Sequence, residues 1–264
     1  MKKNNRYITF IFVFILLAIS APAQKINFID PDNLLTKKEN LSLEKALQYE
    51  SDFFNRLFSN ETVNMQDIRF IVVSNYLAFM NLQSKYGVVH VNSSGFFAPK
   101  DSTLVVFKDK KSEVNNFLPI CYHEFSHAFL RLHTGDKYIP VWLNEGLADY
   151  LKQMTYDKNK ITQQINNYSI TRVKTLIDIK DLNLSEFVNW SYDKFSTESF
   201  TQEGYGYAVG YNIVLFLMQQ QGEDKSFVIF RNLIGAHSTI EVLDKYYPGG
   251  FSQFEKNFVL YLGR

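Results

Sequence analysis

The sequence feature that most constrains this chain is the pentapeptide His123-Glu124-Phe125-Ser126-His127. On a helix, residues four apart differ by about 40° in rotation and about 6 Å along the axis, so both imidazoles project from one face. That geometry lets two imidazole nitrogens bind one Zn²⁺ at about 2.0–2.1 Å. Glu124, one step round the helix, is placed to reach a water on the metal, an arrangement suited to hydrolysis.

The residues around the pentapeptide predict the helix that it needs. Asn115 or Asn116 can cap such a helix, and apolar residues on both sides of the motif supply a buried surface: Phe117, Leu118, Ile120, Cys121, Ala128 and Phe129. Burying His, Glu and His on an otherwise apolar helix costs free energy, which pairing of these side chains or a function must offset. The alternative interpretation of the motif alone is a helix with two ordinary surface histidines. Residues later in the chain decide between this interpretation and a metal site.

Two residues compete for the role of third metal ligand, and His133 is the first. It stands six residues after His127, the spacing at which metzincin-type enzymes place a third histidine after a glycine that breaks the helix. The intermediate position here is Leu130, within a run that favours a continuing helix. His133 would then lie about 9 Å farther along the helix and about 120° round it from His127, out of reach of the metal.

Glu145 is the better candidate for the third ligand. It follows Pro140, a residue suited to a helix start, in a segment that continues amphipathically. Asp149 lies four residues later on the same face, so Glu145 can bind the metal while Asp149 accepts the distal N–H of a ligating histidine. The sequence therefore predicts a zinc site of His123, His127 and Glu145, with Asp149 behind it.

Together these motifs resemble the gluzincin zinc metallopeptidases, especially the aminopeptidase N family and the broader peptidase MA-like domains. The resemblance covers roughly residues 103–230. It rests on the pentapeptide and on two further segments, Trp142-Leu143-Asn144-Glu145-Gly146-Leu147-Ala148 and Tyr207-Ala208-Val209-Gly210-Tyr211. It implies an α+β, zincin-like fold in which the two motif histidines and the glutamate of the second segment hold zinc.

The resemblance also implies roles in catalysis. Glu124 would be the general base, and Tyr207 would stabilise the oxyanion that forms when the scissile carbonyl is attacked. Three other residues remain alternatives for the second role: Tyr205, Tyr211 and His237.

Two departures from the aminopeptidase N pattern bear on the activity. The interval between His127 and Glu145 is one residue shorter than in that family. In addition, no Gly-x-Met-Glu-Asn segment precedes the zinc helix to hold the free amine of a substrate, and the comparable region, residues 95–99, contains no carboxylate. We therefore expect an endopeptidase rather than an aminopeptidase, acting on a peptide or protein. A catalytically silent peptide-binding module and a zinc hydrolase of a non-peptide bond are the alternatives.

The amino terminus predicts export to the periplasm or the extracellular space. Three basic residues precede a short apolar run ending in Ala21-Pro22-Ala23, so residues 1–23 are typical of a signal peptide cleaved before Gln24. The run is shorter than the roughly 20 residues of a membrane span, although retention as an anchor is the alternative. If this segment is removed, 25 of the 28 lysines and arginines remain, against 27 acidic residues. That charge balance predicts no basic patch for nucleic acid.

Composition and periodicity predict the domain organisation. The 264 residues are 46% hydrophobic, with 24 Phe and 16 Tyr, which suffices for a sizeable core. Strand patterns before the pentapeptide fall at 69–73, 88–91 and 103–107, and helical patterns at 40–58 and 76–85. Later patterns are almost wholly helical: 142–154, 184–192, 205–220, 225–234 and 251–262.

The expected architecture for residues 24–264 is a mixed sheet lobe over about 24–137, followed by a mainly helical lobe over about 138–264. The metal site would lie between them. The strand predicted at 103–107 could pair with an extended substrate at a sheet edge. The single cysteine, Cys121, excludes an internal disulfide framework and is expected to be a buried apolar residue.

Overall fold

The structure is a computed structural model, described for residues 26–59, 63, 68–88, 93–109, 117–157, 160–178, 182–201 and 204–263. The predicted signal peptide and its cleavage site lie outside these residues. So do most of the strand predicted at 88–91 and the two asparagines expected to cap the motif helix. No helix within the described ranges is long and apolar enough to span a bilayer.

A small mixed sheet forms from the amino-terminal part of the chain. β1 (Asn27–Ile29), β2 (Arg69–Val73) and β4 (Thr103–Phe107) are parallel, and β3 (Gly95–Ala98) pairs antiparallel with β4, in the order β1-β2-β4-β3. A 3₁₀ turn, η1 (Pro99–Asp101), joins β3 to β4. The predicted strands at 69–73 and 103–107 are confirmed.

The expectation that the strand at 103–107 offers a free edge to substrate is wrong. β4 pairs with β2 on one side and with β3 on the other, so its backbone groups are already engaged. Among the described strands the two edges of the sheet are β1 and β3, and β3 adds antiparallel to β4 because the chain turns back through η1.

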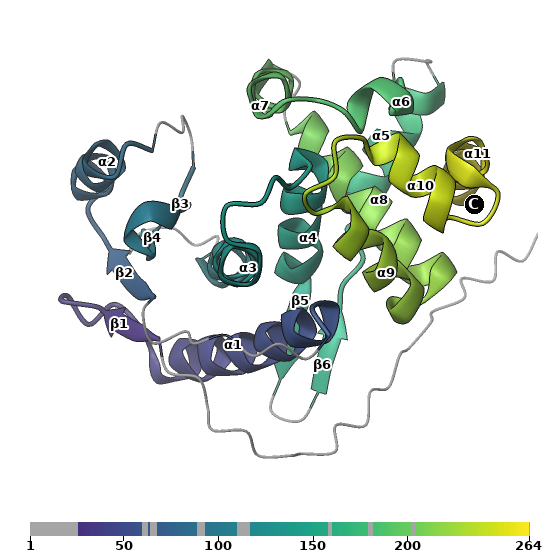
Figure 1. Ribbon diagram of the computed structural model, residues 1–264. Coiled ribbons are helices and arrows are strands. Elements are labelled where there is room, and N and C mark those ends of the chain that lie inside the picture. Colours follow the sequence, from purple (N-terminus) through teal and green to yellow (C-terminus); the bar gives the residue numbers. More distant parts are fainter. Residues whose placement is uncertain are drawn as a thin grey trace, which may run out of the picture.

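Helices cover both faces of the sheet because apolar residues alternate along its strands. α2 (Tyr76–Lys85) packs on one face, where Phe79 joins Phe96 and Val105 in a small cluster. On the other face Phe70 meets Phe125 of α3 (Phe117–Thr134), with ring centroids 5.5 Å apart. Figure 1 shows α2 and α3 on opposite sides of the strands.

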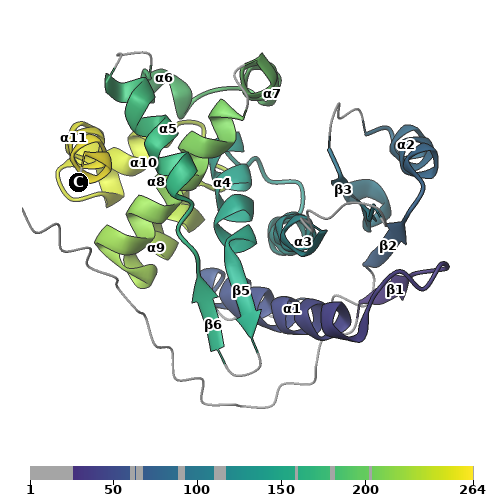
Figure 2. The same cartoon turned by 180° about the vertical axis from the view of Figure 1, so that it is seen from behind.

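α1 (Lys37–Leu57) connects the sheet region to the later helices. Thr36 begins it with a capping box, in which its side chain accepts from the amide of Glu39 and the Glu39 carboxylate accepts from the amide of Thr36. The helix then contacts α3, β5 (Met154–Asp157) and α9 (Glu223–Leu233). It runs beneath both parts of the molecule (Figures 1 and 2), and one apolar core extends from Ile26 to Leu262.

The carboxyl-terminal part is mainly helical and surrounds α8 (Tyr205–Gln221). α4 (Val141–Lys152) makes the most extensive contact with α8. The other elements of this part are a hairpin of β5 and β6 (Lys160–Gln163), α5 (Asn167–Asp178), α6 (Leu184–Phe187), α7 (Tyr192–Thr201), α10 (Thr239–Tyr246) and α11 (Gly250–Leu262).

Two glycines let α4 and α8 approach closely. A Cβ atom on Gly146 would lie 2.5 Å from the carbonyl oxygen of Gly210, and one on Gly210 would lie 2.8 Å from the carbonyl oxygen of Trp142. Any side chain at either position would therefore push the helices apart. This contact fixes the start of α8, and with it Tyr207, against the helix that carries Glu145.

The mixed α+β class predicted from sequence is confirmed, with corrections in the second half. The helix predicted at 142–154 ends at Lys152, and Met154 begins β5 instead. The helix predicted at 184–192 ends at Phe187 as α6, and Tyr192 begins a separate helix, α7. Helices α5, α7 and α10, strand β1 and the β5–β6 hairpin were not predicted.

Candidate metal centre

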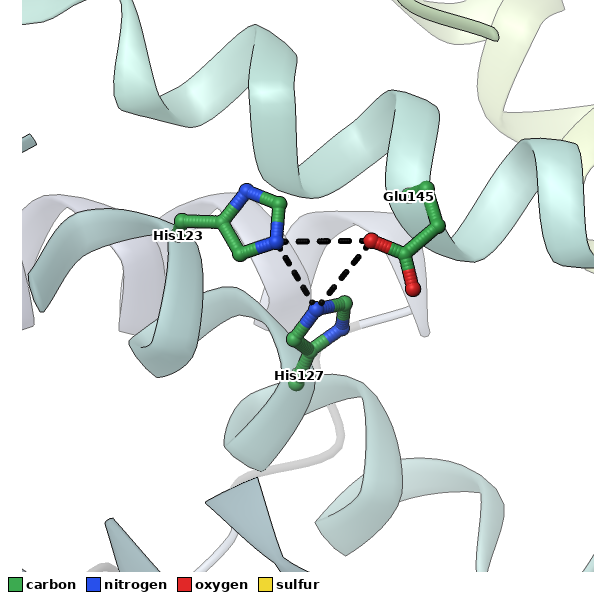
Figure 3. A group of neighbouring side chains, drawn as sticks. All are labelled: His123, His127 and Glu145. Atoms are coloured by element: carbon green, nitrogen blue, oxygen red, sulfur yellow. Dashed lines mark hydrogen bonds and ion pairs between the residues drawn. The ribbon is translucent and has the colours of Figure 1, made fainter. Parts of the chain in front are cut away.

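Three side chains from α3 and α4 converge on one point (Figure 3). His123 and His127 lie one turn apart on α3, and α4 crosses α3 so that Glu145 faces both rings. The two Nε2 atoms are 3.1 Å apart, and Oε2 of Glu145 lies 3.4 Å from Nε2 of His123 and 3.5 Å from Nε2 of His127. All three residues are largely buried.

The spacing of these atoms fits a metal ion. Tetrahedral coordination at about 2.0–2.1 Å puts donor atoms about 3.3–3.4 Å from one another, which is close to the three observed separations. Two imidazole nitrogens and a carboxylate oxygen are also donors that bind divalent transition metals. This group of His123, His127 and Glu145 could therefore hold a metal ion.

The far side of each imidazole is held by an oxygen of α4. Nδ1 of His123 lies 2.9 Å from Oδ1 of Asp149, and Nδ1 of His127 lies 3.1 Å from Oδ1 of Asn144. Because each oxygen is an acceptor, each Nδ1 carries the proton, and the neutral ring then turns the lone pair of Nε2 toward Glu145. Three electron-pair donors face one another, an arrangement that only a cation or shared protons can stabilise.

The pKa values of the cluster reflect the same concentration of negative charge. Burial would lower the pKa of His123, but the carboxylates of Asp149 and Glu145 outweigh burial and raise it to about 10. Burial alone would raise the pKa of Glu145, whereas the neighbouring His127 and His123 hold it well below its usual range. The metal-free cluster therefore holds a positive charge between its side chains, at the position where a metal ion would bind.

Glu124 lies beside this cluster on the wall of a pocket. The residue is buried on α3 next to His123. Gly95 at the start of β3 makes room for it, since a Cβ atom there would lie 2.6 Å from Cγ2 of Ile120 and 3.1 Å from Oε1 of Glu124. The absence of a side chain at Gly95 thus lets the edge strand pass close to the carboxylate.

The pocket has a volume of about 730 Å³ and opens over the metal centre. His123, Glu124 and Asp149 form part of its wall, and β3, α4 and α7 surround it. The other described residues that line it are Ser93, Ser94, Gly95, Ile120, Lys152, Ser196, Thr197, Ser199, Phe200, Gly204 and Tyr207.

Among the tyrosines considered for oxyanion stabilisation, Tyr207 is the one that lines this pocket. Its ring centroid lies 6.5 Å from that of His123 and 5.1 Å from that of Phe195, the second pair in an edge-on arrangement. Burial and the negative charge of Glu145 raise the pKa of its hydroxyl, so Tyr207 remains a proton donor at neutral pH.

The alternatives for that role point elsewhere. Tyr211 is buried, and its hydroxyl accepts from the backbone amide of Asn166 at 3.1 Å. Tyr205 is packed against Phe187 and Trp190. His237 is not among the described residues that line the pocket.

His133 lies outside the metal centre because α3 continues through Leu130 to Thr134, as the sequence predicts. Its Nε2 lies 3.3 Å from Oδ1 of Asn55, and its ring stacks on Phe58 with centroids 4.7 Å apart. It therefore packs against α1. Cys121 is fully buried, as expected.

Two residues at the site were not identified from sequence. Asn144, adjacent to the proposed ligand Glu145, holds His127. Lys152, at the end of α4, lies 3.4 Å from Oδ1 of Asp149 and also lines the pocket. Spacing provided a signal for Lys152, because it follows Asp149 by three residues on the same face.

The chain matches no protein-family model, and no curated protein matches it.

Proposed function

We propose that this protein is an exported zinc-dependent peptidase of the gluzincin type, with a zincin-like fold. The observation that carries the proposal is the convergence of His123, His127 and Glu145 in one cluster, whose His123 lines an open pocket together with the buried Glu124. Sets of two histidines and one glutamate leave a coordination position free for water or substrate, which is typical of catalytic rather than structural zinc.

Different residues of the chain have separate roles in hydrolysis. When bound, zinc would lower the pKa of a coordinated water toward about 7. Glu124 accepts the proton of the attacking water and passes it to the leaving amine. Asp149 and Asn144 keep both imidazoles in the tautomer that ligates, because each oxygen holds an Nδ1 proton.

Tyr207 stabilises the carbonyl oxygen as negative charge develops on it. The hydroxyl keeps its proton because its pKa is raised, and the ring lies beside His123 in the same pocket. Such a donor contributes most when the charge has formed, so its effect appears in turnover more than in substrate binding.

The edge strand β3 supports an extended peptide as the substrate. It is an end strand of the sheet that the described residues form, it begins at the pocket with Gly95, and it passes Glu124 closely. Backbone pairing along such an edge would hold a peptide through its main chain. The absence of a carboxylate in residues 95–99 favours cleavage inside a peptide over removal of its first residue.

The test is turnover of a mixed peptide library, followed by mass spectrometry. We expect internal cleavage that a chelator abolishes and added zinc restores. Cleavage that survives complete removal of metal would contradict the proposal. Zinc binding without turnover of any peptide would favour the silent binding module or the hydrolase of a non-peptide bond.

A further inference from the structure

Helix α4 lines the pocket with charged side chains beyond Glu145. Asp149 and Lys152 follow Glu145 by four and seven residues, so the three side chains share one face of the helix. The two later side chains line the pocket that also contains His123 and Glu124. The pocket lining therefore combines the candidate metal ligand His123 of α3 with a lysine of α4.

The ammonium group of Lys152 retains capacity for a ligand. Its Nζ lies 3.4 Å from Oδ1 of Asp149, longer than the about 2.7–2.9 Å of a strong charge-assisted hydrogen bond. That oxygen also faces Nδ1 of His123 at 2.9 Å, so it is shared between two donors. The Lys152 side chain is 36% exposed, and an ammonium has three N–H donors.

The rest of the pocket suits an anion at this position. Lys152 is the only lysine or arginine among the described lining residues. Five of the described lining residues are small and hydroxyl-bearing: Ser93, Ser94, Ser196, Thr197 and Ser199. Hydroxyls and an ammonium together can donate to both oxygens of a carboxylate.

We propose that Lys152 binds a carboxylate of the substrate and gives the site a preference for acidic peptides. This inference rests on the proposed peptidase function. About 10 Å of helix separates the α-carbons of Glu145 and Lys152, so the carboxylate lies within about three residues of the bond that is cleaved. It belongs either to an aspartate or glutamate side chain or to the free carboxyl end of the peptide.

A different role for Lys152 would be to position Asp149, and through it His123. In that role the lysine would affect all substrates by the same factor, because the metal centre is common to them. Binding of a substrate carboxylate instead changes the ratio between acidic and neutral peptides. The ratio therefore separates the two roles.

The experiment measures equilibrium binding of short fluorescent peptides by anisotropy, with zinc-loaded Glu124→Gln protein so that no peptide is consumed. Peptides with Glu or Gln at one position, both amidated, test the side-chain source. Peptides of one neutral sequence with a free or amidated carboxyl end test the terminal source. In one of these two pairs we expect the peptide with the additional carboxylate to bind at least about tenfold more tightly than the other peptide of the pair.

Substitutions at Lys152 then test the assignment. Lys152→Gln and Lys152→Met should abolish the preference, Lys152→Arg should retain most of it, and Lys174→Gln, a change at an exposed lysine of α5, should leave it intact. Zinc content and circular dichroism confirm that each variant is folded and loaded. An equal loss for acidic and neutral peptides, an unchanged preference in Lys152→Gln, or no preference in the parent protein would overturn the inference.

The result can be distinguished from failure of the proposed function. Binding that prefers acidic peptides and depends on Lys152, without hydrolysis by the wild-type protein, would retain the inference as a statement about peptide binding and reject the peptidase. Hydrolysis that depends on zinc but does not depend on peptide charge would support the peptidase and reject the role of Lys152.

Discussion

The middle and the carboxyl end of helix α3 carry histidines in contrasting surroundings. His123 and His127 face α4, which supplies oxygens behind both rings and a carboxylate in front of them. His133, less than two turns farther on, faces α1, where its ring lies 4.7 Å from that of Phe58 and its Nε2 meets the side chain of Asn55. The residue type is the same, and the neighbouring helix determines whether the imidazole is positioned to ligate or to pack.

The substitution with the largest expected effect is Glu124→Gln, in the middle of α3 beside His123. Turnover should fall by about 10²–10⁴-fold because the amide cannot accept a proton from water, while bound zinc is retained. Peptide hydrolysis and metal analysis on the same sample measure both. His133→Gln, at the carboxyl end of the helix, should keep wild-type turnover. Normal turnover in Glu124→Gln would remove this residue from the mechanism.

A smaller loss is expected from Tyr207→Phe, which removes only the hydroxyl of this pocket-lining residue. Turnover should fall at least tenfold, and by up to about 10²–10³-fold, with zinc content and peptide binding preserved. Tyr211→Phe is the matched control on the same helix, because its hydroxyl accepts from Asn166 instead. If Tyr211→Phe lowers turnover and Tyr207→Phe does not, the oxyanion role belongs to Tyr211.

A pair of asparagines tests the comparison between the histidines directly. Asn144→Ala removes the oxygen behind His127, and Asn55→Ala removes the one beside His133. Affinity for zinc, measured by competition with a chelator, should fall about 10–100-fold in Asn144→Ala. It should be unchanged in Asn55→Ala, and equal losses in both variants would show that the contacts act only through stability.

The affinity for zinc is expected to rise with pH over a wide range. The pKa of His123 in the metal-free protein is raised to about 10, so near neutral pH zinc must displace a proton. The apparent affinity should rise with pH by about tenfold per unit for each proton displaced, and it should level off near that pKa. Asp149→Asn should move the plateau to lower pH, since Asp149 helps to raise the pKa. An affinity independent of pH would contradict this account.

Periodicity and spacing predicted the parts of the site that lie on single helices. Four-residue spacing placed His123 beside His127 and Glu145 in line with Asp149, and the lack of glycine at position 130 predicted that α3 continues. Contacts between helices could not be predicted from the sequence in this way. The approach of Asn144 to His127 depends on the angle at which α4 crosses α3, and no local pattern encodes that angle.

The fold shows the same division between local and non-local information. β2 and β4 were predicted because their β-branched runs fit a buried strand, but the position of β3 at the sheet edge depends on pairing across the chain. α7 was missed because Ser and Thr give it weak helical propensity, and it is held by burial of Phe195. The β5–β6 hairpin was missed because its sequence is mostly polar.

Zinc content measured in two variants of α3 and α4 tests the central claim most directly. Wild-type protein, Glu145→Ala and His133→Ala are purified identically, dialysed against a weak chelator and analysed for metal per chain. We expect about one zinc in the wild type and in His133→Ala, and strong depletion in Glu145→Ala, because a catalytic zinc site of this type is held by three protein ligands. Depletion in His133→Ala with full retention in Glu145→Ala would contradict the claim.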